Sequence, residues 1–187
     1  MSRIGVLAWG SLKWDPRHLS TRGTWHDDGP TLPLEFSRKS LDGRLTLVID
    51  RTHGEACRSG WWESGLTDVA SAITNLGDRE GTRFVASIVL DGKSGATSDR
   101  VVDSIRIWLN ESVMDAVIWT DLKPNFREAL GIEFSVEQAM SYLQQLTGET
   151  RRAAWEYLER APVAVQTPLR QRLVDEGWIT VRSEVRS

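Results

Sequence analysis

Hydrophobic and polar positions alternate along the first half of the chain in a way that predicts β-strands. Between residues 32 and 36 every second residue is apolar, and Glu35 and Ser37 occupy the other face, which is the period of a half-buried strand. Asp42-Gly43 separates this strand from a second one over Arg44–Asp50, so the two predict a β-hairpin. Further strands are predicted at Arg3–Ala8, Ala56–Trp62, Val85–Leu90 (a buried strand) and Val113–Trp119.

Apolar residues spaced three and four apart predict helices in the middle and the second half of the chain. One helix covers Leu66–Leu76, with Gly77 as its end, and another covers Val101–Leu109. Later helices are predicted after a Ser135/Gln138 capping box, over Thr150–Arg160, and from Thr167-Pro168 to Gly177.

The order of these elements indicates the fold class. Residues 14–31 are rich in loop signals, residues 92–98 form a Gly/Ser-rich turn, and residues 120–134 predict a long functional loop. Strands first and helices later predict an α+β fold. We expect a single domain over residues 1–187, built on a small mixed β-sheet or partly closed barrel flanked by helices, with a helical C-terminal part at 135–187.

Composition narrows the classes of function. The net charge is −3, whereas a nucleic-acid-binding surface would need a basic stripe. The apolar runs are too short to cross a bilayer, and the N-terminus lacks a signal peptide's apolar region. Cys57 is the single cysteine, which favours a buried hydrophobe in a reducing, cytoplasmic compartment. We therefore expect neither nucleic acid nor a membrane as a partner.

Several familiar motifs are incomplete. Gly92-Lys93-Ser94 lacks the glycine that a phosphate-binding loop needs at Ser87. Ser11 lacks the flanking glycines of a nucleophile elbow. The three histidines show no metal-ligand spacing, so no metal site is expected.

The first candidate for chemistry is the segment Trp9-Gly10-Ser11-Leu12, which follows the first predicted strand. Glycine lets a backbone approach a ligand closely, and successive N–H groups in such a turn can bind a carboxylate or an oxyanion. The segment continues through Lys13 to Trp14. A plain turn at the end of a strand is the alternative interpretation.

The second candidate is Glu80, in Asp78-Arg79-Glu80-Gly81, just beyond the predicted helix and before an apolar strand. Partial burial there would raise its pKa and suit it to proton transfer. The alternative is an exposed charged turn.

Together, these two segments resemble the γ-glutamylcyclotransferase superfamily. Its signature is an aromatic-Gly-Ser turn after the first strand and a catalytic glutamate after the first helix. Gly10-Ser11-Leu12, with Trp14 and Pro16 behind it, is most similar to the glutathione-specific branch. The similarity covers about residues 3–90, and Trp9 stands where the family has tyrosine.

The resemblance implies a reaction without a cofactor. In the family, the α-amino group of a γ-glutamyl compound attacks its own γ-carbonyl, giving 5-oxoproline and a free amine or peptide. It implies Glu80 as general acid-base, the backbone at residues 10–12 as the binding element for the α-carboxylate or oxyanion, and Trp9 and Trp14 as pocket walls. Arg44 or Arg79 is a candidate partner for a substrate carboxylate. The alternatives are another amide-processing reaction, or a non-catalytic small-molecule-binding or interaction protein on the same scaffold.

Overall fold

The chain folds into two compact units, each of which combines a β-sheet with helices. A computed structural model describes residues 2–90 and 99–180. The first unit contains residues 1–32 and 58–122, and the second contains residues 33–57 and 123–187. The chain therefore passes from one unit to the other three times.

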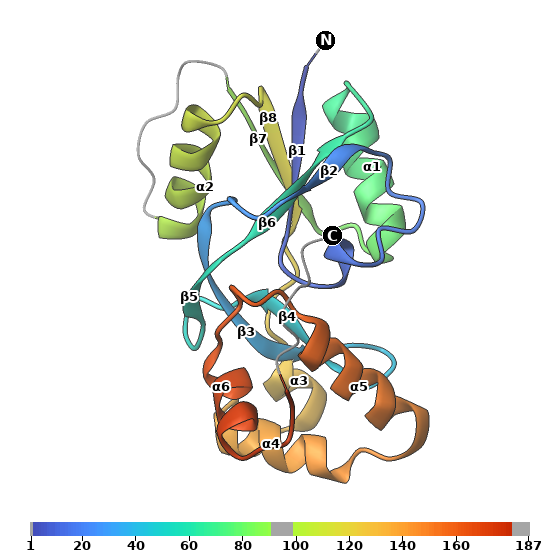
Figure 1. The fold of residues 1–187 in the computed structure, drawn as a ribbon, viewed down its shortest axis with the longest axis vertical. Helices are drawn as coiled ribbons and strands as arrows, with labels where there is room; N and C mark the ends of the chain where they lie inside the picture. Colours follow the sequence, from blue (N-terminus) through green and yellow to red (C-terminus); the bar gives the residue numbers. More distant parts are fainter. Residues whose placement is uncertain (1, 91–98, 181–187) are drawn as a thin grey trace. The chain divides into compact units, whose positions relative to one another are not determined.

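The first unit is built on an open, mixed five-stranded sheet with the strand order β2-β6-β1-β8-β7 (Figure 1). β1 and β8 run parallel, whereas the other neighbouring pairs are antiparallel. β2 and β7 are the two edges. The strands are β1 (Ile4–Ala8), β2 (Thr21–His26), β6 (Gly60–Ser64), β7 (Val85–Val89) and β8 (Ala116–Thr120).

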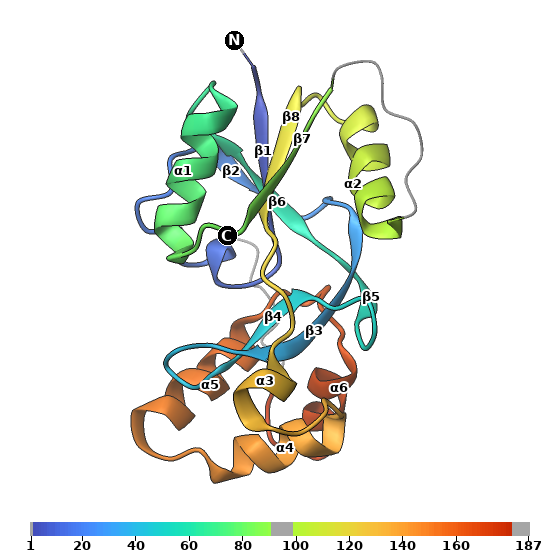
Figure 2. The ribbon, with the colours of Figure 1, turned by 180° about the vertical axis from the view of Figure 1, so that it is seen from behind.

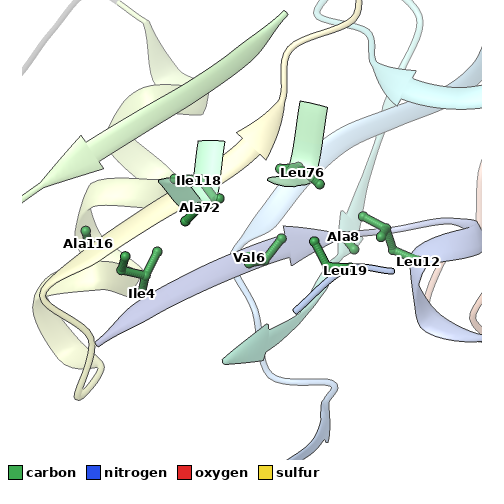
Figure 3. Close-up of a cluster of buried hydrophobic side chains, with 9 residues drawn as sticks. All are labelled: Ile4, Val6, Ala8, Leu12, Leu19, Ala72, Leu76, Ala116 and Ile118. Carbon is green, nitrogen blue, oxygen red and sulfur yellow. The ribbon is translucent and has the colours of Figure 1, made fainter. Parts of the chain in front are cut away.

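Helices α1 (Val69–Glu80) and α2 (Arg100–Glu111) cover opposite faces of this sheet, as both ribbon views show (Figures 1 and 2). Alternation along β1 explains this arrangement, because successive side chains of a strand point to opposite faces. Ile4, Val6 and Ala8 pack in one cluster with Ala72 and Leu76 of α1 (Figure 3). The Cα of Gly5 faces the other way, toward the ring of Trp108 on α2.

Among its described residues, the second unit combines a three-stranded sheet of order β4-β3-β5 with four helices. β3 and β4 form the predicted antiparallel hairpin. Phe36, Phe126 and Leu143 are among the side chains of this unit that are buried completely or nearly so. The elements are β3 (Thr31–Lys39), β4 (Leu45–Ile49), β5 (Glu55–Arg58), α3 (Phe126–Leu130), α4 (Val136–Gln145), α5 (Gly148–Arg160) and α6 (Pro168–Asp175).

The α+β class is confirmed, and so is the mixed sheet. The strands form two separate sheets, however, and neither closes into a barrel among the residues that the structure describes. The helical character of the segment from residue 135 onward is confirmed up to residue 175. The Ser135 hydroxyl accepts a hydrogen bond from the Gln138 N–H (3.2 Å), and Pro168 opens α6. The expectation of one domain over the whole chain stays a prediction.

Two predicted loops contain regular structure. Residues 14–31 include β2, which pairs with β6 through an irregular register and carries exposed polar residues. Such an edge strand lacks the alternation that marks a half-buried strand. Residues 120–134 include α3, whose five residues are too few for a clear helical period. The predicted turn at 92–98 lies outside the described residues.

Three predicted strands have a different character in the structure. Ala56–Trp62 is two strands, because the Ser59 N–H donates to the Pro30 carbonyl (3.1 Å) and interrupts the run between β5 and β6. β7 is an edge strand rather than a buried one, and its end at Val89 is 51% exposed. β3 is buried on both faces at its centre, since Glu35 and Ser37 are as inaccessible as Phe36.

The end of α1 also differs from the prediction. The helix continues through Gly77 to Glu80, and Gly81 ends it with a left-handed φ of 63°. The Thr82 N–H donates to the Gly77 carbonyl (2.9 Å), which folds the chain back onto the last turn. Gly77 is needed for this close approach, because a Cβ there would lie 2.7 Å from the Thr82 carbonyl oxygen. Glu80 is therefore the last residue of the helix.

We expect Gly77→Ala to destabilise the protein despite the higher helix propensity of alanine. The steric cost of an overpacked site is about 1–3 kcal/mol, and the propensity gain offsets about 1 kcal/mol of it. The net loss of about 1 kcal/mol is measurable by urea unfolding. Thr74→Ala, on the exposed side of the same helix, is the matched control and should cost less. If Gly77→Ala were as stable as the wild type or more stable, a Cβ at residue 77 would not clash with the Thr82 carbonyl oxygen.

Candidate functional site

A short 3₁₀ helix, η1 (Ser11–Lys13), follows β1 directly, with Gly10 as its N-cap. The Lys13 N–H donates to the Gly10 carbonyl and the Trp14 N–H donates to the Ser11 carbonyl, both at 3.1 Å. The hydrogen bonds of the helix therefore begin at Lys13, and they do not use the N–H groups of Ser11 and Leu12. The resemblance noted in the sequence predicts that these two N–H groups bind a carboxylate or an oxyanion.

Two contacts fix this segment, called here the 10–15 loop, on the body of the first unit. Leu12 is 5% exposed and belongs to the same hydrophobic cluster as Ala72 and Leu76 of α1 (Figure 3). The indole N–H of Trp62, on β6, donates to the Leu12 carbonyl (3.0 Å). The loop and the C-terminal half of α1 are thus held in one packed arrangement.

Arg79 joins the 10–15 loop to Glu80. Its side chain is only 3% exposed, and its Nη1 lies 2.6 Å from Glu80 Oε1. Its Nη2 donates to the Asp15 carbonyl and to Ser11 Oγ (3.3 Å). The structure therefore brings Ser11 and Glu80 to the same guanidinium, although more than sixty residues separate them in sequence. Both ribbon views show the segment after β1 beside the end of α1 (Figures 1 and 2).

The electrostatic environment of Glu80 favours retention of a proton. Its side chain is 20% exposed, and burial raises the pKa of the carboxyl above its usual value. The positive charges of Arg79 and Arg17 oppose this effect, and the Asp15 carboxylate adds to it. A carboxyl whose pKa is displaced upward in this way is suited to both accepting and returning a proton.

The two tryptophans of the predicted pocket differ in exposure. Trp9 is 5% exposed at the end of β1, where it forms part of the core. Trp14 is half-buried and ends η1. Their contact with a substrate stays a prediction.

Arg44 belongs to the second unit. Its Nε lies 2.7 Å from Asp42 Oδ2, and its guanidinium lies over the ring of Tyr157 (5.5 Å to the centroid). These contacts give Arg44 a structural role in the β3–β4 turn. Arg79, the other candidate partner of a substrate carboxylate, is occupied by the 10–15 loop and Glu80.

Sequence reasoning did not find three residues of this region. Asp15 lies in the stretch 14–31 that the sequence predicts to be a loop, yet its carbonyl accepts a hydrogen bond from Arg79. Arg17 and Trp62 carry no motif, and their involvement depends on pairing between β6 and β1 and on the turn after η1. Asp15-Pro16 was the one available signal, because it marks a turn immediately after the Gly-Ser segment.

Other parts of the described chain offer less chemistry. A surface hollow of about 670 Å³ lies along α5 and is lined by residues such as Arg151, Trp155 and Glu159. Among residues 2–90 and 99–180, no group of three or more His, Cys, Asp or Glu side chains could hold a metal ion. Within the same ranges, no helix has the length and apolar character to cross a bilayer. Cys57 is buried, as predicted, and burial raises the pKa of its thiol to about 11.

Comparison of the chain with protein-family models, with curated proteins and with solved structures finds no match in any of the three.

Proposed function

We propose that this protein is a γ-glutamylcyclotransferase-like enzyme, with Glu80 as its general acid-base. The observation that supports this proposal most strongly is the buried Arg79 guanidinium, which contacts both Ser11 and Glu80. Two segments that carry the resemblance therefore lie on either side of one side chain. The raised pKa of Glu80 supports the same assignment.

In the proposed reaction, the α-amino nitrogen of a γ-glutamyl compound attacks its own γ-carbonyl carbon. Glu80 takes a proton from the attacking nitrogen and delivers it to the leaving nitrogen as the amide C–N bond breaks. The products are 5-oxoproline and an amine or peptide. Because nucleophile and carbonyl belong to one molecule, holding the donor in a folded, near-attack shape lowers the barrier.

The 10–15 loop supplies the groups that orient the donor. The backbone N–H groups of Ser11 and Leu12 hold either the α-carboxylate or the oxyanion that develops on the γ-carbonyl oxygen. The hydrogen bonds from Trp62 to the Leu12 carbonyl and from Arg79 to the Asp15 carbonyl hold this backbone in place before the substrate binds. Such preorganisation is favourable because no reorganisation is then needed during the reaction.

The direct test is a screen for 5-oxoproline release. The purified chain of 187 residues is incubated with glutathione, γ-glutamyl dipeptides and γ-glutamyl alkylamides, and 5-oxoproline is quantified by mass spectrometry. We expect turnover on at least one of these compounds, and α-glutamyl dipeptides as matched controls should give none. Absence of release from the whole panel would overturn the proposal.

A further inference from the structure

Arg17 has a backbone conformation that arginine adopts only at a cost. Its φ is 50°, and it is the sole non-glycine residue with positive φ in residues 2–90 and 99–180. The Leu19 N–H donates to the Pro16 carbonyl (3.0 Å), so Arg17 is the first central residue of a β-turn. Positive φ at this position alone is the pattern of a type II′ turn, where glycine is preferred. Strain of this kind in an ordered turn points to a function for the side chain.

The Arg17 side chain is linked to the candidate catalytic group through Asp15 and Arg79. Its Nε is 3.1 Å from Asp15 Oδ2, and the same Asp15 oxygen is 4.0 Å from Arg79 Nη2. Arg79 in turn contacts Glu80, and the charge of Arg17 opposes the rise in the pKa of the Glu80 carboxyl that burial causes. Unlike Arg79, which is buried, Arg17 has a side chain that is 54% exposed. It is therefore the accessible cation of this cluster.

We infer that Arg17 binds the α-carboxylate of the γ-glutamyl donor, an inference that rests on the proposed function. The reasoning follows from the connectivity of the donor. Glu80 takes its proton from the α-amino group, and the α-carboxylate is bonded to the same carbon atom. A donor whose amino group reaches Glu80 therefore places its carboxylate next to that residue. A guanidinium matches a carboxylate through two parallel hydrogen bonds.

This assignment leaves each of the other groups a distinct task. Arg79 is committed to the Asp15 carbonyl, Ser11 and Glu80, so it holds the site rather than the substrate. The N–H groups of Ser11 and Leu12 then serve the developing oxyanion. Asp15 holds the Arg17 guanidinium through their ion pair.

Arg17→Gly tests the inference sharply, because glycine suits the backbone of this turn and removes only the side chain. The probes are L-5-oxoproline, which has the carboxylate, and L-5-oxoprolinamide, which is its neutral counterpart. Binding of each is measured by NMR titration of the wild-type and variant proteins. We expect the variant to bind 5-oxoproline about tenfold more weakly, the loss typical of a charge-assisted contact, and to bind the amide as the wild type does. Its melting temperature should be unchanged or higher, since the strain is relieved.

The control variant is Arg22→Ala, which removes an exposed arginine of β2 that pairs with Glu63, and it should bind 5-oxoproline normally. Three results would overturn the inference. The wild-type protein and Arg17→Gly could bind 5-oxoproline with equal affinity, or the wild type could fail to bind it. The third such result is that Arg17→Gly loses affinity for 5-oxoproline and for the amide to the same extent. The proposed function is judged separately by 5-oxoproline release. If Arg17→Gly turns over the donor with an unchanged KM, Arg17 does not bind the α-carboxylate, and the proposed function still holds. If 5-oxoproline binds in a way that depends on Arg17 but no γ-glutamyl compound is turned over, the proposed reaction is wrong and the carboxylate-binding site at Arg17 still holds.

Discussion

Glu80→Gln is expected to abolish most of the turnover while leaving the fold intact. Glutamine has nearly the same shape, and its amide oxygen can still accept the hydrogen bond that Arg79 Nη1 donates to Glu80. It cannot take up and return a proton near neutral pH, so the geometry is kept and the acid-base chemistry is lost. General acid-base catalysis contributes about 10²- to 10⁴-fold in rate. We therefore expect a fall of that size in kcat, with a smaller effect on KM.

Asp78→Asn is the matched control for this experiment. Asp78 lies two residues earlier in the last turn of α1, and its side chain is exposed. The substitution removes the same charge from the same helix terminus, so it separates a general electrostatic effect from proton transfer. Kinetics of 5-oxoproline release and thermal melting of both variants form the measurement. Near-normal turnover of a stable Glu80→Gln protein, or equal losses in both variants, would contradict the role assigned to Glu80.

The candidate site shows what a linear pattern can and cannot reveal. The Gly10-Ser11 turn after β1 could be predicted because it is a local feature with a recognisable sequence, whereas the functional roles of this turn and of Glu80 stay predictions. The function of Arg79 as the link between them could not be predicted, since it depends on α1 continuing past Gly77 so that Arg79 is buried against the 10–15 loop. The role of Arg17 could not be predicted either, because nothing in this sequence marks Arg17 as a non-glycine residue with positive φ.

The fold was predictable where one physical signal dominated. The β3–β4 hairpin followed from alternation and from the Asp42-Gly43 turn, and α6 followed from Pro168 at its first position. Edge strands were the main failure. β2 is polar and irregular, and β7 has an apolar sequence that is typical of a buried strand although one of its edges is unpaired in the sheet. Position within a sheet is decided by long-range pairing, which local hydrophobicity does not encode.

Glu35 is the clearest case of tertiary structure overriding the pattern. Alternation in β3 places it on the face opposite Leu34 and Phe36, which a half-buried strand turns toward solvent. In the structure it is fully buried, because the N-terminus of α6 covers that face. Its carboxylate accepts hydrogen bonds from the N–H groups of Phe36 (2.7 Å) and Leu169 (3.2 Å). Burial outweighs these contacts and raises the pKa of the carboxyl to about 7, and the charge of Asp50 adds to the rise.

Because the pKa of Glu35 is raised, we expect this residue to lower the stability of the protein as the pH rises from acidic to neutral. The pKa of the folded state lies above the unfolded value of 4.5, so the folded state binds the proton more tightly. The contribution is fully present below the unfolded pKa and is lost as the pH rises through about 7. Linkage between these two pKa values gives a loss of about 2 to 3 kcal/mol between pH 5 and pH 8.

Urea unfolding of the wild-type protein and Glu35→Gln at several pH values between 5 and 8 measures this contribution. Glutamine does not titrate, so the difference in the free energy of unfolding between the two proteins should change by about 2 to 3 kcal/mol over this range. The wild-type protein should gain relative to the variant as the pH falls. Glu55→Gln, at the exposed start of β5 in the same unit, should follow the pH dependence of the wild type. Parallel curves for the wild type and Glu35→Gln would mean that the buried carboxylate is ionised throughout, with its two backbone hydrogen bonds outweighing the cost of burial.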